Sequence, residues 1–200
     1  MRRLVIALDW DDSLVDYNQG FVDYHNVHHG TCVKYEDIHT HEMKLMWNCE
    51  EAVIVERTAT FRKSEGFGRL LPMPGAREAV TYLRQFHDLH IVTNRAESFR
   101  EATLADAVRH FDNPFAGMHF ANGFGADPGM PKRPKSAPCK AIGASVLIED
   151  APSHAREVAA CGIPVLMLDR PWNRKETPPG VTRVRSWEEA VRWIDRHAHQ

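Results

Sequence analysis

The sequence predicts an α/β fold in which a parallel central sheet lies between layers of helices. Short apolar runs rich in β-branched residues recur along the chain, at residues 4–8, 89–92, 145–148 and 164–168. Such runs are too short for helices and are typical of strands buried on both faces. An amphipathic stretch precedes each of the last three runs, and 200 residues suffice for one domain with a small insert. The alternation indicates a doubly wound sheet.

The other elements continue this alternation. The amphipathic stretches are expected to form helices at 75–86, 135–142 and 153–161. A helix near 97–110 is expected before a weaker strand at 117–120, and a strand at 181–184 precedes a closing helix at 186–197. The segment 123–138 is rich in glycine and proline, so we expect a loop there.

Residues 17–71 interrupt the pattern, because no buried strand is evident and the apolar residues follow helical spacing. We expect a small helical insert with helices near 18–29, 41–47 and 51–66. Prolines and a glycine at 72–75 mark the return to the main fold. The predicted organisation is therefore an α/β core formed by residues 1–16 and 72–200, and an insert formed by 17–71.

Charge and cysteine content exclude several classes of protein. The chain has 25 Lys and Arg against 27 Asp and Glu, so no strong field favours a nucleic-acid polymer or an anionic membrane as partner. No apolar run approaches the roughly 18 residues of a membrane span. The four cysteines form no CxxC pair, which favours reduced thiols and a cytoplasmic location.

Acidic residues follow two of the predicted strands. Asp9, Asp11 and Asp12 come directly after the first strand, and Glu149 and Asp150 end another. Carboxylates that cap a helix or face water would explain either group alone. The carboxyl ends of parallel strands meet at one edge of the sheet, however, and acids gathered there need a cation. Oxygen ligands of this kind predict Mg²⁺ with a phosphate-bearing substrate.

Polar residues at two further positions complete the predicted site. Thr93 and Asn94 end a third strand and offer a hydroxyl and an amide to an anion. Lys135 lies at the expected start of a helix, where its ammonium group would neutralise the acids and a phosphoryl group. Each residue alone is more often a helix cap or a surface residue, so the prediction depends on their combination.

This order of motifs resembles the haloacid dehalogenase (HAD) superfamily of phosphohydrolases. The resemblance covers Asp-x-Asp-x-Ser from Asp9, then Thr93, Lys135 and the Glu149-Asp150 pair. Residues 9–21, 73–75, 148–150 and 169–173 resemble the 5′(3′)-deoxyribonucleotidase-like branch. The resemblance implies a Rossmannoid three-layer fold with a parallel central sheet, in which the insert is a small helical C1-type cap.

The resemblance also implies a role for each residue. Asp9 would be the nucleophile, which forms an aspartyl-phosphate, and Asp11 would be the general acid and then the general base. The metal ligands would be Asp9, the Asp11 backbone carbonyl, Asp150 and, directly or at one remove, Glu149. Thr93, Asn94 and Lys135 would hold the phosphoryl oxygens. The second aspartate favours phosphate esters over halides, because a halide leaves without a proton.

Substrate contacts are expected from Trp10, which follows the nucleophile, and from Tyr17, which matches an aromatic position of the nucleotidase motif. Two residues depart from the usual motif: Asp12 stands where Gly is common, and Ser13 where Thr or Val is usual. The chain also has 12 histidines, and His25 and His29 have the i, i+4 spacing of a zinc site. A hydrogen-bonded or solvated helix face explains that pair better, since no HExxH motif or nearby cysteine pair accompanies it.

We therefore expect a Mg²⁺-dependent phosphatase that hydrolyses small phosphate monoesters through an aspartyl-phosphate, and more specifically a 5′-nucleotidase acting on nucleoside or deoxynucleoside monophosphates. One alternative is a phosphatase for another small metabolite, such as a sugar or cofactor phosphate. A mutase or transferase would use the same intermediate. The non-enzyme alternative is a binding scaffold of HAD type. No oligomeric state follows from the sequence.

Overall fold

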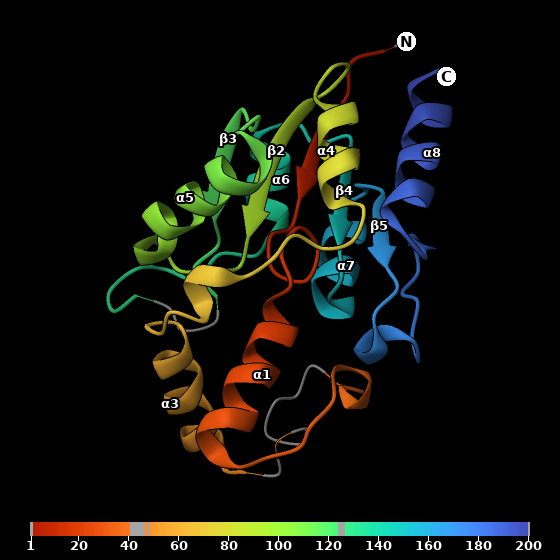
Figure 1. Cartoon of the computed structure of the whole chain (residues 1–200). Coiled ribbons are helices and arrows are strands. Elements are labelled where there is room, and N and C mark those ends of the chain that lie inside the picture. The colour runs from red at the N-terminus through yellow and green to blue at the C-terminus, as the bar shows by residue number, and fades with distance from the viewer. Residues whose placement is uncertain (1, 41–46, 48, 124–126, 200) are drawn as a thin grey trace.

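A parallel sheet of six strands organises the chain in the computed structural model, which describes residues 2–40, 47, 49–123 and 127–199 (Figure 1). The strand order is β3-β2-β1-β4-β5-β6, and every neighbouring pair is parallel. The strands are β1 (Val5–Leu8), β2 (Asp88–Thr93), β3 (Gly117–Phe120), β4 (Val146–Glu149), β5 (Val165–Leu168) and β6 (Val181–Val184). The predicted α/β fold is thus confirmed.

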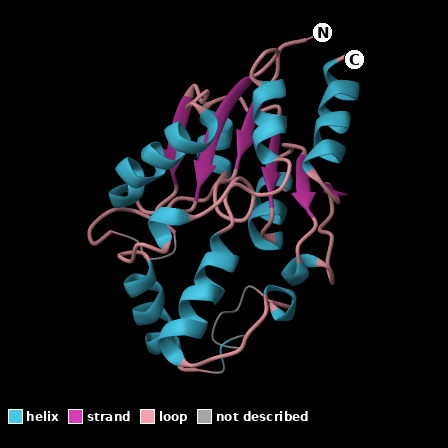
Figure 2. Cartoon of the chain, in the orientation of Figure 1, coloured by secondary structure: helices cyan, strands magenta, loops and turns pink. Residues whose placement is uncertain are grey.

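Helices cover both faces of this sheet (Figure 2). Side chains alternate along a strand, so Ile6 and Leu8 belong to one apolar cluster while Ala7 belongs to the other. The first cluster includes residues of α4 (Ala76–Leu83), α5 (Arg100–Phe111) and α8 (Trp187–Ala198). The second includes residues of α6 (Ser136–Ala141) and α7 (Pro152–Ala159). Two layers of helices therefore enclose the sheet, as the three-layer prediction requires.

The helical insert (residues 17–71) lies beyond the carboxyl ends of the strands (Figure 1). It contains α1 (Tyr17–His29), α3 (Glu51–Phe61) and two 3₁₀ turns, η1 (Tyr35–Asp37) and η2 (Phe67–Arg69). Aromatic rings pack between these elements, with centroids 5.4 to 6.3 Å apart for Phe21–Phe61, Tyr17–Phe61 and Tyr17–Phe67. The boundaries of the insert as a separate domain stay a prediction.

Two of the boundaries predicted from the sequence are wrong. The helix expected over 51–66 ends at Phe61, because the Ser64 hydroxyl donates to the Phe61 carbonyl at 2.6 Å and the chain turns. The loop expected over 123–138 ends earlier, since α6 already begins at Ser136. The helix expected over 41–47 lies outside the described residues except for Trp47.

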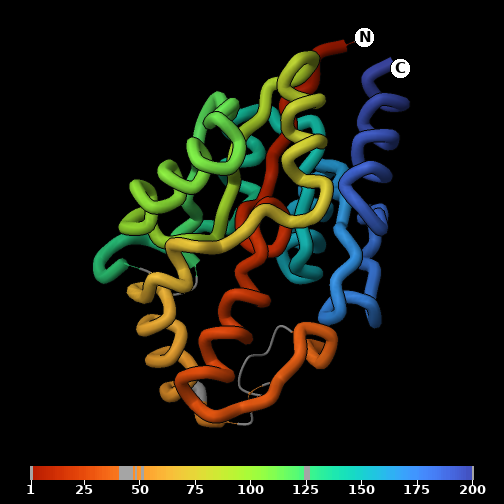
Figure 3. Tube along the Cα trace, in the orientation of Figure 1, coloured from red at the N-terminus to blue at the C-terminus, as the bar shows by residue number. Residues whose placement is uncertain are grey.

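The connection from β3 to β4 carries the chain from one half of the sheet to the other, so the topological switch point lies between the neighbouring strands β1 and β4. Doubly wound sheets bind ligands at the carboxyl edge beside such a point. Segments far apart in sequence meet near the carboxyl ends of the strands (Figure 3). Tyr35 of η1 contacts Trp172 of η4 (Pro171–Asn173) edge to face, with ring centroids 5.6 Å apart. At the opposite edge the two ends of the chain meet, where the Arg2 amide donates to the Ala198 carbonyl. Among the described residues, no helix has the length and hydropathy that a membrane span requires.

Candidate active site

Asp9 is the first residue after β1, and it lies between the two central strands. Its backbone amide donates to the Ile148 carbonyl of β4 at 2.9 Å, which continues the ladder one residue past β1. The residue is 5% exposed. Burial raises the pKa of Asp9 to about 6, the charge of Glu149 adds to the rise, and Lys135 opposes it. The fold thus holds a carboxylate at the switch point of the sheet.

Lys135 bridges the two buried carboxylates at this edge. Its Nζ lies 2.6 Å from Asp9 Oδ1 and 2.7 Å from Glu149 Oε2, and the residue is 1% exposed. Burial alone would lower the pKa of Lys135, but the two carboxylates outweigh it and the pKa is raised. A permanently charged ammonium group therefore stands beside the candidate nucleophile.

Glu149 and Asp150 have different surroundings although they are adjacent. Glu149 is fully buried, and its second oxygen, Oε1, accepts from the backbone amides of Asp150 and Ala151 at 3.2 and 3.0 Å. Both of its oxygens are thus engaged. Asp150 Oδ2 accepts from the indole of Trp172 at 2.9 Å. Burial raises the pKa of Asp150 well above its usual range, and the charges of Glu149 and Asp9 raise it further.

Carboxylate oxygens of Asp9, Glu149 and Asp150 all lie within 4.8 Å of one another. This is the one group of three potential metal ligands found among the described residues. Its donors are hard oxygens, and burial together with the repulsion among the acids raises the pKa values of Asp9 and Asp150. The residues present therefore fit a hard divalent cation such as Mg²⁺.

Asp11 forms an ion pair that the sequence did not predict. Arg95 follows β2 and donates to both Asp11 oxygens, from Nε at 3.0 Å to Oδ2 and from Nη2 at 2.7 Å to Oδ1. The Arg95 side chain is 3% exposed and the Asp11 side chain 25%. No motif at residue 95 distinguishes this arginine from a surface residue, because its partner lies 84 positions away.

Asp12 and Ser13 shape the loop that carries Asp11. Asp12 has a φ of +58°, a left-handed conformation that Gly adopts at no cost and that Asp tolerates. Its Oδ1 accepts from the Asn18 amide at 2.9 Å and so caps the start of α1. The unusual Asp at this position is thus accommodated by its own hydrogen bond. Ser13 is fully buried, and its carbonyl accepts from the indole of Trp187.

Thr93 and Asn94 reach the same edge from the end of β2. Thr93 is 1% exposed, and its hydroxyl accepts from the Arg95 amide at 3.2 Å. The Asn94 side chain passes so close to Gly123 that a Cβ at residue 123 would lie 1.9 Å from Asn94 Oδ1. Gly123 therefore leaves the space that the Asn94 amide occupies.

These residues surround a hollow of about 220 Å³. Eight of the nine predicted site residues line it: Asp9, Asp11, Tyr17, Thr93, Asn94, Lys135, Glu149 and Asp150. Asn18, Ile38 and His154 also line it, and none of these had been predicted. Burial lowers the pKa of His154 to about 4, and the charge of Lys135 adds to this effect, so its ring is neutral.

Trp10 is the predicted site residue that does not line the hollow. Its ring has no exposed area and packs edge to face on Phe111 and Phe115. Asp9 and Trp10 point to opposite sides because side chains alternate where an extended chain leaves a strand. The substrate contact predicted for Trp10 lacks an exposed surface in this structure, and its role is in the core.

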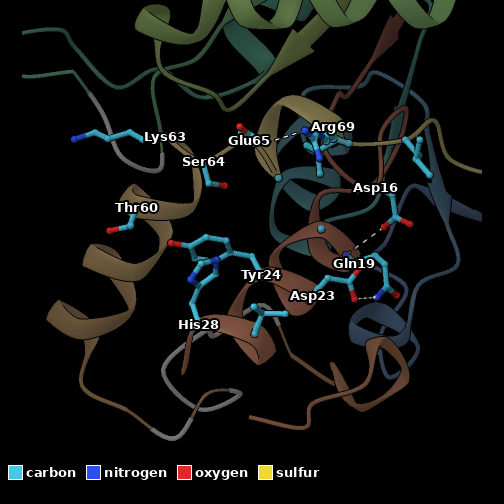
Figure 4. Close-up of a pocket in the computed structure, with 15 residues that line it drawn as sticks. Asp16, Gln19, Asp23, Tyr24, His28, Thr60, Lys63, Ser64, Glu65 and Arg69 are labelled. Carbon is cyan, nitrogen blue, oxygen red and sulfur yellow. Dashed lines mark hydrogen bonds and ion pairs between the residues drawn. The ribbon is translucent and has the colours of Figure 1, made fainter. Parts of the chain in front are cut away.

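A larger hollow, of about 760 Å³, lies on the helical insert between α1 and α3 (Figure 4). Its lining includes Tyr24, His28, Lys63 and an ion pair between Arg69 and Glu65. None of the predicted site residues takes part. Size alone would have pointed to this hollow, but the convergent charged groups are in the smaller one.

The histidine pair of the insert shows no zinc geometry. His25 Nδ1 lies 2.8 Å from Thr31 Oγ1, and Arg57 donates to His25 Nε2 at 2.9 Å. Both ring nitrogens of His25 are thus in use. A hydrogen-bonded helix face, the alternative favoured from the sequence, describes this pair.

Comparisons with known proteins give the family of this chain and several proteins of similar fold. The model of the family described as 5′ nucleotidase, deoxy (pyrimidine), cytosolic type C matches residues 3–200. The chain belongs to this family. The family is one of nucleotidases, and the fold of the chain is similar to those of solved HAD-type hydrolases.

Three similar proteins share 28% sequence identity or less with this chain. A protein of Halalkalibacterium halodurans, named provisionally as a nucleotidase, is 28% identical over 122 residues, which are 60% of this chain and 57% of that protein. Among solved structures, a HAD-like hydrolase of Streptococcus pneumoniae has a TM-score of 0.68 at 16% identity, covering 96% of this chain and 98% of that one. A HAD hydrolase of Bacillus subtilis, described as bound to magnesium, has a TM-score of 0.63 at 15% identity, covering 98% and 100%.

Proposed function

We propose that this protein is a Mg²⁺-dependent 5′-nucleotidase that hydrolyses nucleoside or deoxynucleoside monophosphates through an aspartyl-phosphate at Asp9. The observation that carries the proposal is the pairing of the buried Asp9 carboxylate with Lys135 beside Asp150, at the switch point of the sheet. The family description supports the substrate class. The four unpaired cysteines support a reducing, cytoplasmic location.

Asp9, Asp150 and the backbone carbonyl of Asp11 would hold the metal ion. When bound, Mg²⁺ offsets the repulsion between an anionic nucleophile and an anionic phosphate ester. Glu149 has a different task in this proposal: with both oxygens engaged, it holds Lys135 against Asp9.

In the first step a carboxylate oxygen of Asp9 attacks phosphorus, and the bond between phosphorus and the ester oxygen breaks. Asp11 gives its proton to that leaving oxygen. Lys135, Thr93 and the Asn94 amide bind the phosphoryl oxygens, where negative charge spreads in the transition state. The products are the nucleoside and an aspartyl-phosphate.

In the second step water attacks phosphorus of this intermediate, and its proton passes to the Asp11 carboxylate. The bond between phosphorus and the Asp9 oxygen breaks, which releases inorganic phosphate and restores the Asp9 carboxylate. The two steps leave Asp11 protonated again, so the site is ready for the next ester.

A phosphate-release screen with Mg²⁺ tests the substrate class. The panel contains nucleoside and deoxynucleoside 5′-monophosphates, matched 3′-monophosphates, sugar phosphates and cofactor phosphates. We expect the highest kcat/KM for a 5′-monophosphate and loss of turnover with EDTA. A clear preference for a sugar or cofactor phosphate would overturn the nucleotide assignment. Transfer of the phosphoryl group to a second substrate, with little release of phosphate, would indicate a mutase or transferase.

A further inference from the structure

Arg95 donates hydrogen bonds to both oxygens of the Asp11 side chain. Its Nε lies 3.0 and 3.2 Å from the two Asp11 oxygens, and its Nη2 lies 2.7 Å from Oδ1. A guanidinium fork that engages both oxygens fixes the plane of a carboxylate as well as its position. Exposed ion pairs contribute little, but this arginine is 3% exposed, so solvent does not compete for its donors.

The guanidinium group of Arg95 is anchored independently of Asp11. Its Nη1 donates to Thr103 Oγ1 at 2.9 Å, and Thr103 is fully buried in α5. The Arg95 Cζ lies 4.8 Å from the centre of the Phe67 ring, within the range of a cation–π contact. Arg95 is therefore held from α5 and from the helical insert at once, and it presents a fixed fork to Asp11.

We propose that Arg95 is a positioning residue: its guanidinium group sets where the carboxyl group of Asp11 lies relative to Asp9. The inference rests on the proposed function, because the position of Asp11 matters only if Asp11 transfers protons. The Asp11 carboxyl group needs a partner that holds it in place, because Asp11 lies in a tight loop and a quarter of its side chain is exposed. The Arg95 fork restricts the rotation that this exposure would allow.

This role has a distinctive kinetic consequence. Proton transfer to the leaving oxygen matters most for poor leaving groups, and general acid catalysis contributes about 10²- to 10⁴-fold. Loss of the Arg95 fork should therefore slow the hydrolysis of an alkyl phosphate more than that of 4-nitrophenyl phosphate. An arginine that bound the phosphoryl group directly would affect both esters equally, because both carry the same group.

The test is a double-mutant cycle on two esters, with the full chain and saturating Mg²⁺. The variants are Arg95→Gln, Asp11→Asn and the double variant. We expect Arg95→Gln to lower kcat on the alkyl phosphate by roughly tenfold or more and by less on 4-nitrophenyl phosphate, with KM nearly unchanged. In the Asp11→Asn background, the same substitution should have almost no further effect.

Three further variants make the outcome decisive. Arg100→Gln removes an exposed arginine of the same segment and should match the wild type. Arg95→Lys restores a charge without the fork and should recover only part of the loss. Thr103→Val removes the acceptor that anchors the guanidinium group, together with the hydrogen bond that this hydroxyl donates to the Phe99 carbonyl. It should give a smaller loss of the same pattern even if Arg95→Gln fails to fold.

The outcomes separate this inference from the proposed function. Equal losses on the two esters, or losses that multiply in the double variant, would overturn the positioning role while the wild-type turnover upholds the phosphatase. If the wild-type protein turns over no phosphate ester, the proposed function and this inference fall together. Mg²⁺ binding by calorimetry should be unchanged in Arg95→Lys, which confirms that the kinetic effect is local.

Discussion

Glu149 and Asp150 are adjacent acids, and we expect their substitution to affect the stability of the protein and the binding of Mg²⁺ in different ways. Replacing Glu149 with Gln removes one of the two charges that hold the buried Lys135 ammonium group. Breaking a buried pair costs about 3–5 kcal/mol. Because Asp9 remains and Gln still offers an acceptor, we expect Glu149→Gln to lower the free energy of unfolding by about 2–3 kcal/mol.

Asp150→Asn should instead leave the metal-free protein as stable as the wild type or slightly more stable. Burial and the charges of Glu149 and Asp9 all disfavour the ionised Asp150 side chain. The amide keeps an acceptor for Trp172 and removes the repulsion. The same substitution removes a proposed Mg²⁺ ligand, however, so the stabilisation by Mg²⁺, about 2.7 kcal/mol at 100 times the dissociation constant, should disappear.

Urea unfolding of the wild type and both variants, with EDTA or with excess Mg²⁺, measures both effects without a substrate. In EDTA, we expect the free energy of unfolding of Glu149→Gln to be lower than that of the wild type, and Mg²⁺ should raise it by nearly as much as it raises the wild-type value. We expect the free energy of unfolding of Asp150→Asn in EDTA to equal the wild-type value, and Mg²⁺ should raise it by almost nothing. If Glu149→Gln loses the Mg²⁺ effect while Asp150→Asn keeps it, the roles assigned to the two acids are wrong.

Two smaller predictions concern residues around the site and in the helical insert. Gly123→Ala should displace the Asn94 amide, because the new Cβ would lie 1.9 Å from Asn94 Oδ1. The loss of one hydrogen bond to a charged phosphoryl oxygen should raise KM about tenfold. An unchanged KM would contradict this prediction. Burial, with the charges of His29 and Arg57, lowers the pKa of His25 from 6.5 to about 4. The stabilisation by neutral His25 is therefore complete above pH 6.5 and lost as the pH falls toward 4, by at most about 3 kcal/mol. Unfolding of His25→Gln and the wild type at several pH values should show their stability difference shrinking on acidification, whereas a constant difference would refute the assignment.

The fold was predictable because its strands are buried on both faces and therefore read as continuous apolar runs. Even the weaker strands were placed correctly: β3 and β6 span the predicted 117–120 and 181–184. The convergence of Asp9 and Glu149 was also predictable, since parallel strands bring their carboxyl ends to one edge, and Lys135 was expected there from its place at the start of a helix. The residues that meet there were thus foreseeable from their order along the chain.

What escaped prediction depends on the direction of individual side chains. The Arg95–Asp11 pair joins residues 84 positions apart, and no periodicity encodes which way either side chain turns. Trp10 was expected at the site because of its position in sequence, yet strand alternation turns it into the core. The separate tasks of Glu149 and Asp150 likewise follow from hydrogen bonds to backbone amides, which depend on the local turn.

The central claim is that Asp9 becomes phosphorylated, and a chemical trap tests it most directly. Wild-type protein mixed with substrate and Mg²⁺ is quenched in acid and reduced with borohydride, which converts an aspartyl-phosphate to homoserine. Peptide mass spectrometry then locates the reduced residue. We expect homoserine at position 9, dependent on substrate and absent in Asp9→Asn, which should also lose turnover. Turnover by Asp9→Asn, or homoserine at another aspartate, would contradict the account.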